Sequence, residues 1–496
     1  VELPKDLAFL TSIFIRNFRY WKFEANSKNL SDTFFYNAKD CHTTLWVFLA
    51  IMDEIPEWAL DNYVLKFKEV FPATHCGLRG FKDDATERER LITEEEAKKE
   101  ETLRWLQNVV HPEFNPNSHI QVKELMRVLG FRVDSSDDAT LTSIADADPF
   151  NALIVEKIQD YRGATKLISS YFNYPVLEGR VLFSLNPFGT DSGRFSSSPH
   201  HFSKTEINTK GGFKYIHYGV AIQTVPRNAK SMLIADTGYL LGEIDYSQSE
   251  SRTTGYITGE EALINAVETS PDFHCANASL FFGIPFEELY DAENHKKLNI
   301  PIRDLSKRTN HGFNYGMGDW KLLYTMGAKN IRKAQQLLNL PKGWRPVKVA
   351  AYLLNSVDKA YPKIHGEYMQ NLIEEVKSTG MMKLPCEEFP WTRMTFKNID
   401  IKHNLNSALS FKPQSLSGLK CNNSYYKIWK RFDLIEKRIK VVTPVHDSIV
   451  FQYKIGDEKV AEELRKVMET PMTINGRVMR IPVDCGLGAK TWADTK

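Results

Sequence analysis

Two aspartates stand at the ends of strand-like segments, and their residue type suits metal chemistry. The segment YLLGEID is apolar and ends at Asp245. Asp447 lies between Val441–Val445 and Ile449–Phe451, whose β-branched and aromatic residues are typical of strands. If both strands belong to one sheet, the two carboxylates can meet and bind Mg²⁺ together with substrate phosphates, an arrangement that suits two-metal nucleotidyl transfer. The alternative is that both aspartates are turn or cap residues, and these residues alone leave the two interpretations open.

A second constellation lies on Ile302–Tyr315, which we expect to be a helix with a polar stripe. Four residues at a spacing of four drift by only about 40° per step around the helix, namely Arg303, Lys307, His311 and Tyr315. Two cations followed by two flat rings would let one face grip a triphosphate and then pack against a sugar and base. The alternative is a solvated amphipathic face. Gly312 and Gly316 each weaken a helix by about 1 kcal/mol relative to Ala, so they predict a close approach of another part of the chain.

The length and composition set the frame in which these groups must be positioned. A chain of 496 residues predicts two to four domains or one multi-lobed catalytic body, by a rule of about 150 residues per domain. The net charge of +2 does not indicate a nucleic-acid binder, so any basic surface must be local. The six cysteines include no Cys-x-x-Cys pair, which argues against a zinc ribbon or a disulfide framework and favours a reducing compartment.

Targeting signals are also absent from the sequence pattern. No apolar run reaches the roughly 18 residues of a membrane span, and the amino-terminal stretch lacks the order of a secretory signal. We therefore expect a soluble, intracellular protein with no membrane partner. The pattern does not separate the cytoplasm or nucleoid from a virus-infected cell or an organelle. Because the chain starts at Val1 rather than Met, we expect a processed product or an excised fragment.

The composition of several other segments predicts their local structure. We expect a largely helical first lobe, to about Phe67, in which Thr43–Met52 is buried because it is apolar nearly all round. The charged stretch Lys82–Glu101 predicts a solvated helix face. A flexible boundary is expected at Val133–Pro149, which is rich in Ser, Asp and Thr, and a long irregular connection at Pro199–Gly219. Helical spacing resumes at Val347–Lys377, with a break near Pro362.

Three separated motifs give the chain a resemblance to the family A, or polymerase I-like, DNA polymerases. DYSQSESR at Asp245–Arg252 resembles the first palm motif of that family, Asp-Tyr-Ser-Gln-x-Glu-x-Arg. RDLSKRTNHGFNYG at Arg303–Gly316 resembles the fingers-helix motif, and VHDS at Val445–Ser448 resembles the second palm motif, Val-His-Asp-Glu. Three motifs in the expected order are far more specific than any one of them. Weaker similarities to other segments of the family extend the resemblance from about Phe71 to the end of the chain.

The resemblance implies an α+β right-hand polymerase fold, a palm sheet with helical fingers and thumb, preceded by a partial exonuclease-like lobe. The divisions that we expect are an exonuclease-like remnant at 1–66, palm entry and thumb at 67–202, palm with the first catalytic motif at 203–260, fingers at 261–399, and palm with the second catalytic motif at 400–496. The implied activity is template-directed addition of deoxynucleotides to a primer 3′ end by two-metal nucleotidyl transfer.

The resemblance also implies site residues, position by position. Two Mg²⁺ ions, which Mn²⁺ is able to replace, would be bound by the catalytic residues Asp245 and Asp447 and by the carbonyl of Tyr246. The triphosphate would be held by Gln248, His274, Arg303 and Lys307. Around the sugar and the templating position, Glu250 would act as a steric gate, with His311 and Tyr315 nearby. The DNA would contact Lys166, Arg194, Gln414 and His446. Primer-template DNA and dNTPs are the implied partners, with a processivity factor or other replication proteins as further ones.

Some positions depart from the family pattern. His311 stands where the family has Phe or Tyr, so sugar discrimination cannot be carried over. Ser448 replaces the third acidic residue beside Asp447, and Ser249 and Ser251 replace apolar residues. We expect catalysis to survive because the two aspartates supply the metal ligands, with fidelity or metal preference shifted.

The amino-terminal lobe departs further. Tyr36–Asp40 (YNAKD) resembles one motif of a 3′–5′ proofreading exonuclease, but nothing before it supplies the other acidic residues of such a site. We therefore expect no proofreading by this chain, either because the exonuclease part was removed or because only a remnant exists.

Three rival functions stay open at this point. A single-subunit RNA polymerase shares the right-hand plan, although Glu250 in a DNA-type motif argues against it. A catalytically silent DNA-binding or architectural protein is opposed by the presence of both aspartates with Arg303 and Lys307. A metal-dependent phosphohydrolase leaves the striped helix unexplained.

Overall fold

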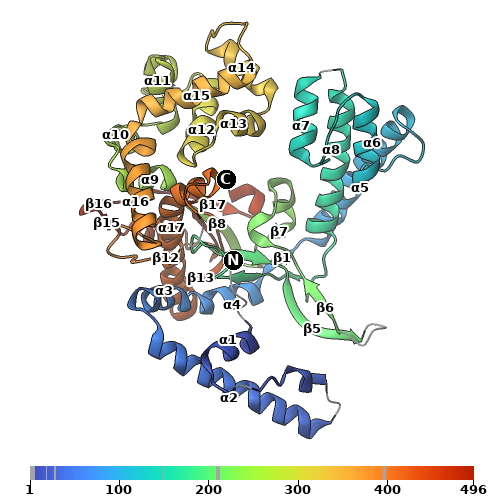
Figure 1. The fold of residues 1–496 in the computed structure, drawn as a ribbon, viewed down its shortest axis with the longest axis vertical. Helices are drawn as coiled ribbons and strands as arrows, with labels where there is room; N and C mark the ends of the chain where they lie inside the picture. Colours follow the sequence, from blue (N-terminus) through green and yellow to red (C-terminus); the bar gives the residue numbers. More distant parts are fainter. Residues whose placement is uncertain are drawn as a thin grey trace.

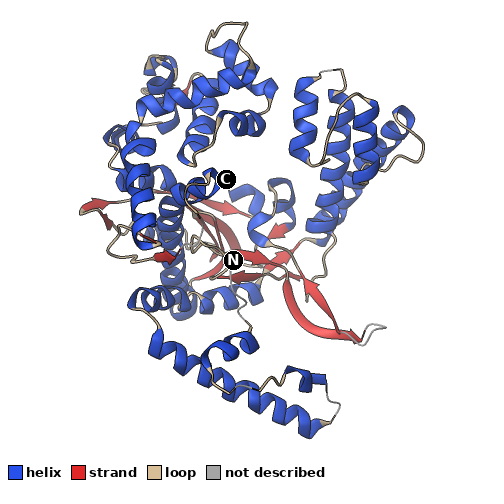
Figure 2. Ribbon diagram, in the orientation of Figure 1, coloured by secondary structure: helices blue, strands red, loops and turns tan. Residues whose placement is uncertain are grey.

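The structure is a computed structural model that describes residues 6–17, 19–26, 29–148, 150–207, 213–394 and 398–495. It mixes helices and strands, as expected for an α+β protein (Figures 1 and 2). A central sheet lies between two groups of helices, and a helical lobe built from the start of the chain lies apart from the sheet, at the bottom of Figure 1. No described helix combines the length and apolar character needed to cross a bilayer. All six cysteines are unpaired.

The central sheet is antiparallel and has four strands in the order β13-β14-β8-β17. Its strands are β8 (Tyr239–Tyr246), β13 (Ile439–Val445), β14 (Ser448–Lys454) and β17 (Val483–Ala489). β13 and β14 are buried almost throughout, which explains why their sequence is a nearly continuous apolar run rather than an alternation. The condition under which the two carboxylates can meet, that their strands belong to one sheet, is therefore fulfilled.

Helices hold this sheet in place. The long helix α17 (Lys402–Ile428) continues into a π-helical turn and contacts β13, β14, α9 and α18. The covering elements are α4 (Val70–Arg79), α9 (Ser249–Thr258), the π turn Trp429–Ile435 and α18 (Val460–Met468). Together they enclose the largest apolar core, which includes Phe451, Tyr425 and Leu464. A well-packed sheet of this kind gives the residues at its strand ends fixed positions.

The first helical group packs around an apolar core of its own. It comprises α5 (Ala85–Val109), α6 (His119–Val128), α7 (Asp138–Ala147) and α8 (Ala152–Leu167), followed by a π turn at Ile168–Phe172. Lys82–Glu101 lies mostly in α5, with Leu91 its buried residue, which confirms the solvated face. The flexible boundary expected at Val133–Pro149 is wrong, because α7 begins at an Asp137 cap that accepts from the Thr140 amide at 2.8 Å and buries Leu141.

The second helical group faces the first across the central sheet in Figure 1. It comprises α10 (Glu261–Thr269), α11 (Phe273–Phe282), α12 (Ile300–Asn314), α13 (Asp319–Met326), α14 (Ala328–Leu337), α15 (Pro346–Ala360) and α16 (Met369–Thr379). The break expected near Pro362 is confirmed, because α15 ends at Ala360 and a π turn at Ile364–Tyr368 leads into α16. α12 buries Ile302, Leu305 and Phe313, which leaves its polar stripe on another face.

Short strands connect these parts. They are β1 (Phe81–Asp83), β2 (Arg180–Val181), β3 (Ser184–Asn186), β4 (Ser196–Ser198), β7 (Leu233–Ile234), β9 (Tyr290–Asp291), β10 (Lys296–Lys297), β11 (Met381–Lys383), β12 (Thr392–Met394), β15 (Met472–Ile474) and β16 (Arg477–Met479). The irregular connection expected at Pro199–Gly219 is wrong for its described part. β5 (His200–Ile207) pairs with β6 (Phe213–Tyr218) as an antiparallel hairpin, and the sequence of β6, FKYIHY, is rich in the aromatic and β-branched residues that strands favour.

The N-terminal lobe, 7–67, is helical as expected. It contains α1 (Leu7–Phe14), α2 (Leu30–Glu54) and α3 (Glu57–Phe67). The burial expected for Thr43–Met52 is wrong: Val47 is its buried residue, while Trp46 and Leu49 are 48% and 52% exposed. An apolar helix is buried only where another surface covers it, and the described residues cover one narrow side of α2. The exonuclease-like origin of this lobe stays a prediction.

Candidate active site

The two aspartates come together because a tight turn joins β13 to β14. His446 and Asp447 form the turn, and the pairs Val445↔Ser448 and Ser448↔Asp245 fix the register. The amide of Tyr246 donates to the carbonyl oxygen of Asp447 at 3.2 Å. His446 has a φ of 54°, a left-handed conformation that few non-glycine residues adopt. The sheet thus places the Asp447 turn directly beside the end of β8.

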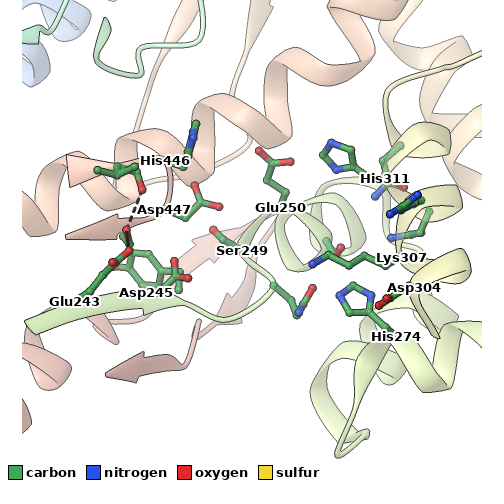
Figure 3. Close-up of a pocket in the computed structure, with 18 of the residues that line it drawn as sticks. Glu243, Asp245, Ser249, Glu250, His274, Asp304, Lys307, His311, His446 and Asp447 are labelled. Carbon is green, nitrogen blue, oxygen red and sulfur yellow. Dashed lines mark hydrogen bonds between the residues drawn. The ribbon is translucent and has the colours of Figure 1, made fainter. Parts of the chain in front are cut away.

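A cavity of about 730 Å³ opens over these strand ends (Figure 3). Nine of the residues selected from the sequence line it: Asp245, Tyr246, Gln248, Glu250, His274, Lys307, His311, His446 and Asp447. Its other lining residues include Lys230, Glu243, Ser249, Ser251, Asp304, Arg308 and Ser448. The strand ends form one side and α12 the other, so segments far apart in sequence share one cavity.

The strand side is acidic, and we call Glu243, Asp245, Glu250 and Asp447 the acidic wall. The Ser417 hydroxyl donates to Asp447 Oδ1 at 2.8 Å and lies 2.7 Å from the Ser249 hydroxyl. Burial raises the pKa of the Asp447 carboxyl above its ordinary value; Arg194 opposes the rise, and Glu250 and Asp245 add to it. A buried carboxylate among other carboxylates is poorly stabilised as an anion, so this wall favours a bound cation.

Arg194 contacts the acidic wall at two of its residues, Glu250 and Asp447. Its Nη2 hydrogen-bonds to Glu250 and lies 3.5 Å from Asp447 Oδ1. The side chain crosses α17 at Gly418, where a Cβ would stand 2.5 Å from Arg194 Cγ. Gly418 therefore opens the route by which Arg194 reaches the site.

Tyr246 lines the cavity, but its ring is buried. The phenol is buried, lies 2.9 Å from the Ser424 hydroxyl and donates to the Met468 carbonyl at 2.7 Å. Burial raises the pKa of this phenol well above its ordinary value. The ring anchors the end of β8 to α17 and the end of α18, which keeps the strand end beside Asp447.

The opposite side carries His274, Lys307, Arg308 and His311, which we call the basic wall; Asp304 lies among them. Burial, together with the charges of Arg303 and Lys307, lowers the pKa of His274 to about 4. Its Nδ1 is buried without a hydrogen-bond partner among the described residues. His274 is therefore neutral near pH 7 and offers an unused polar atom beside the cavity.

Two residues of the α12 stripe are not among those that line the cavity. Arg303 Nε lies 3.0 Å from both Asp272 carboxylate oxygens, and Asp272 also caps α11 by accepting from the Cys275 amide at 2.9 Å. Tyr315 ends α12 and meets the His311 ring edge-on, with 4.8 Å between ring centroids. The stripe is thus real, but its two ends are engaged with neighbours in the second helical group.

Gly316 shows why the sequence has a glycine after the stripe. Its φ is 64°, and a Cβ there would stand 2.6 Å from Asn406 Oδ1 on α17. The close approach expected at this glycine is confirmed.

Of three further predicted residues, Gln248 lines the cavity, whereas Gln414 and Lys166 are not among its lining residues. Gln248 has a left-handed φ of 53° at the start of α9, where it lines the cavity. Gln414 is half-buried on α17, one turn before Ser417. Lys166 is exposed in the last turn of α8, in the first helical group and away from the cavity lining.

Three residues that belong to the site or hold its side chains were not predicted from the sequence. Ser417 and Asp272 contact Asp447 and Arg303 from distant segments, and no local pattern marks them. Glu243 did leave a signal: it stands two residues before Asp245, and alternate residues of a strand share a face.

The donor set fits a divalent cation. Carboxylate and carbonyl oxygens are the ligands that Mg²⁺ prefers, and Asp245, Asp447 and the Tyr246 backbone supply them at one strand end. Among the described residues there is no group of three or more His, Cys, Asp or Glu that could hold a metal ion. Such a cation would therefore depend on substrate phosphates and water for its remaining ligands, as Mg²⁺ commonly does.

Comparison with known proteins gives a consistent result. The family model described as DNA polymerase family A matches residues 85–494. DNA polymerase I, thermostable, from Thermus aquaticus is 25% identical over 369 residues, which are 73% of this chain and 38% of the relative. DNA polymerase I from Helicobacter pylori (strain ATCC 700392 / 26695) is 25% identical over 429 residues, 84% of this chain and 42% of the relative. The chain thus spans about two fifths of the length of these relatives.

A solved structure matches almost the whole fold. The POL domain of Pol1 from M. smegmatis, in complex with DNA primer-template and dNTP, superposes with a TM-score of 0.72 at 17% sequence identity. The match covers 99% of this chain and 80% of that one. The predicted right-hand polymerase fold is therefore confirmed.

Proposed function

The chain belongs to DNA polymerase family A, and from this premise we propose that it extends a DNA primer on a DNA template with deoxynucleoside triphosphates. One observation carries the proposal. Asp245 and Asp447 meet at the ends of the two inner strands of the central sheet. They face the basic stripe of α12 across a single cavity (Figure 3). Opposed acidic and basic walls suit a substrate that is a metal-bound polyphosphate.

The acidic wall would hold the divalent cations. Asp245, Asp447 and the Tyr246 carbonyl are the proposed ligands, with Mg²⁺ as the ion and Mn²⁺ as a substitute. When bound, two such ions supply Lewis acidity toward the attacking primer 3′-oxygen and the departing pyrophosphate. The chain's own contribution is to fix the carboxylates: Ser417 holds Asp447, and the strand pairing holds Asp245 beside it.

The basic wall would hold the triphosphate. Lys307 lies on the cavity face of α12, and His274 is neutral near pH 7, so it would donate a hydrogen bond rather than contribute a charge. Gln248 lies at the strand end between the two walls. Arg303 would join them by exchanging Asp272 for phosphate oxygens, a swap of one anionic partner for another.

The sugar and the DNA would be recognised at the rim. Glu250 would exclude a 2′-hydroxyl, with the His311 imidazole packed nearby and Tyr315 guarding the template position. Arg194 and Gln414 would read the minor groove, where every base pair presents an acceptor. His446 would approach the primer end and Lys166 a backbone phosphate. In this proposal Arg194 leaves Asp447 when DNA and metal bind, because both would compete for the same groups.

Proofreading is not part of the proposal. Within the lobe, Asp40 is 2.9 Å from Lys22 Nζ and 2.6 Å from Trp21 Nε1. That aspartate is thus engaged in holding α2 against the preceding segment. Any exonuclease-like history of the lobe is separate from the polymerase chemistry proposed here.

Primer extension with Mg²⁺ tests the proposal. We expect template-dependent extension with dNTPs and little with rNTPs. Equal use of rNTPs would identify an RNA polymerase, and release of phosphate without extension would identify a hydrolase. Tight binding of primer-template without either reaction would identify a DNA-binding protein. Any of these three results would contradict the proposal.

A further inference from the structure

A third carboxylate of the acidic wall is buried beside the two aspartates. Glu243 lies on β8 two residues before Asp245, so both side chains share one face of the strand. It lines the cavity although it is only 4% exposed. Because a buried carboxylate is costly unless it is well hydrogen-bonded, its position needs an explanation.

The hydrogen bonds of Glu243 join the active site to the end of the chain. Its Oε1 accepts from the Ser448 hydroxyl at 2.7 Å, the dashed line in Figure 3. Its Oε2 accepts from the Thr495 hydroxyl at 2.9 Å and from Trp492 Nε1 at 3.3 Å. Gly486, opposite Glu243 on β17, makes room for this arrangement, since a Cβ there would stand 2.0 Å from the Thr495 carbonyl oxygen.

Ser448 is the residue that replaces an acid in the second palm motif. It follows Asp447 directly and pairs with Asp245 across the sheet. The chain therefore has a hydroxyl where the motif has a carboxylate, and a carboxylate within hydrogen-bond distance of that hydroxyl. In this chain the hydroxyl therefore lies on β14 and the neighbouring carboxylate on β8.

We infer that Glu243 is a positioning residue that restores, from β8, the third negative charge that Ser448 removes from β14. Through Ser448 it orients the strand end that carries Asp447, and from the same face of β8 it adds charge beside Asp245. The inference rests on the proposed function, since it assigns Glu243 to the metal-binding half of that site. Loss of such an outer partner weakens metal binding by about 10- to 100-fold in metalloproteins generally.

A purely structural role is the alternative, because Glu243 also holds the C-terminal turn Trp492–Thr495. The two roles predict different measurements. An anchor for the turn would change thermal stability and leave metal affinity as it is. A charge in the acidic wall would change metal affinity even where the fold is intact.

Mn²⁺ binding, followed by electron paramagnetic resonance without DNA or nucleotide, separates these roles. We expect Glu243→Gln, which keeps the shape and an acceptor for Ser448, to raise the Mn²⁺ dissociation constant about tenfold. Glu462→Gln is the matched control, because Glu462 is an exposed carboxylate on α18 that is not among the residues lining the cavity. It is expected to leave the constant unchanged. Equal effects of the two variants would overturn the inference.

The exchange variant is the sharper test. Glu243→Ser removes the charge, Ser448→Glu places two carboxylates in contact, and we expect each alone to weaken Mn²⁺ binding. The double variant Glu243→Ser/Ser448→Glu moves the carboxylate to β14, where the second palm motif has an acid, and should bind Mn²⁺ within about threefold of the parent. A double variant that binds no better than Glu243→Ser would overturn the inference, whatever its melting temperature.

The result is separable from the proposed function. If the parent chain extends primers and Glu243→Gln binds Mn²⁺ as the parent does, the inference fails and the function stands. If the parent chain does not extend primers but the exchange restores Mn²⁺ binding, the function fails and the role of Glu243 in the acidic wall stands.

Discussion

The two walls of the cavity respond to burial in opposite directions. In the acidic wall, burial raises the pKa of Asp447, and Glu250 and Asp245 raise it further. In the basic wall, burial lowers the pKa of His274, and Arg303 and Lys307 lower it further. Each wall therefore disfavours its own charges and is stabilised by a ligand of the opposite sign. A metal-bound polyphosphate carries both signs, so it would relieve both walls together.

The walls also differ in how far they are assembled. Asp447 is held by Ser417, and its turn is fixed by strand pairing. Beside the basic wall, Arg303 is paired with Asp272 and lies outside the cavity lining. The difference teaches that the fold already holds the carboxylates of the metal half, which needs only the departure of Arg194, while the triphosphate half needs Arg303 to exchange Asp272 for phosphate. Four experiments can break or sharpen this comparison.

Removing an aspartate of the acidic wall should have the largest effect. Asp245→Asn and Asp447→Asn keep the size of the side chain and remove a metal ligand, so we expect each to lower the rate of primer extension by about 10³-fold or more. Single-turnover extension measures this loss. Asp61→Asn, an exposed position on α3, is the control and should match the parent. Activity within tenfold of the parent in either catalytic variant would show that the metal half is not the catalytic one.

Acid should destabilise the protein through the basic wall. His274 binds a proton near pH 6.5 when unfolded but only near pH 4 when folded, so the unfolded state binds more protons below pH 6.5. The free energy of unfolding is then intact above pH 6.5 and falls by about 3 kcal/mol as the pH drops to 4. Urea unfolding of His274→Asn should lack this part of the fall, while His111→Asn should keep it. Identical pH profiles for His274→Asn and the parent would contradict the assignment.

Lys307 tests whether the basic wall binds the triphosphate. Lys307→Met keeps the aliphatic stem and removes the charge, so we expect the KM for dNTP to rise about tenfold with a smaller change in kcat. Steady-state incorporation of one nucleotide measures both constants. Lys321→Met, exposed on the neighbouring α13, should leave KM unchanged. A loss confined to kcat would place Lys307 in the transition state rather than in substrate binding.

Asp272 should give the smallest effect, with an opposite sign. Asp272→Asn retains the cap of α11, because Asn is as good a cap as Asp, but removes the charge that holds Arg303. Because Arg303 would then be free to bind the triphosphate, we expect the KM for dNTP to fall about threefold. The matched control is Asp291→Asn, which also caps its own turn through the Asn294 amide at 3.1 Å. A higher KM would mean that the Asp272 pair positions Arg303 rather than restrains it.

The sequence was informative where the chemistry follows from local pattern. Apolar strands ending at Asp245 and Asp447 made their meeting possible, the family resemblance implied it, and the spacing of four predicted the stripe on α12. A helix pattern such as α12 needs only neighbours along the chain, and a turn such as His446–Asp447 needs only its flanking strands. These features were therefore accessible without any knowledge of the fold.

Other features depend on contacts that the sequence does not encode locally. The partners of Arg303, Asp447 and Arg194 come from elsewhere in the chain: Asp272, Ser417 and Glu250. The exposure of Thr43–Met52 was missed for the same reason, because an apolar helix does not reveal whether anything covers it. The α7 helix was missed because its Asp and Ser caps were taken as signs of a loop, although Leu141 and Ile144 supply the buried face.

The C-terminal turn has a practical consequence for handling the protein. Thr495 donates to Glu243, and its carbonyl oxygen occupies the space that Gly486 leaves open. A purification tag or fluorescent fusion attached just after this turn would therefore lie close to the strand that carries Asp245. A label placed on the exposed face of α2 would lie away from that strand, since α2 lies apart from the central sheet (Figure 1).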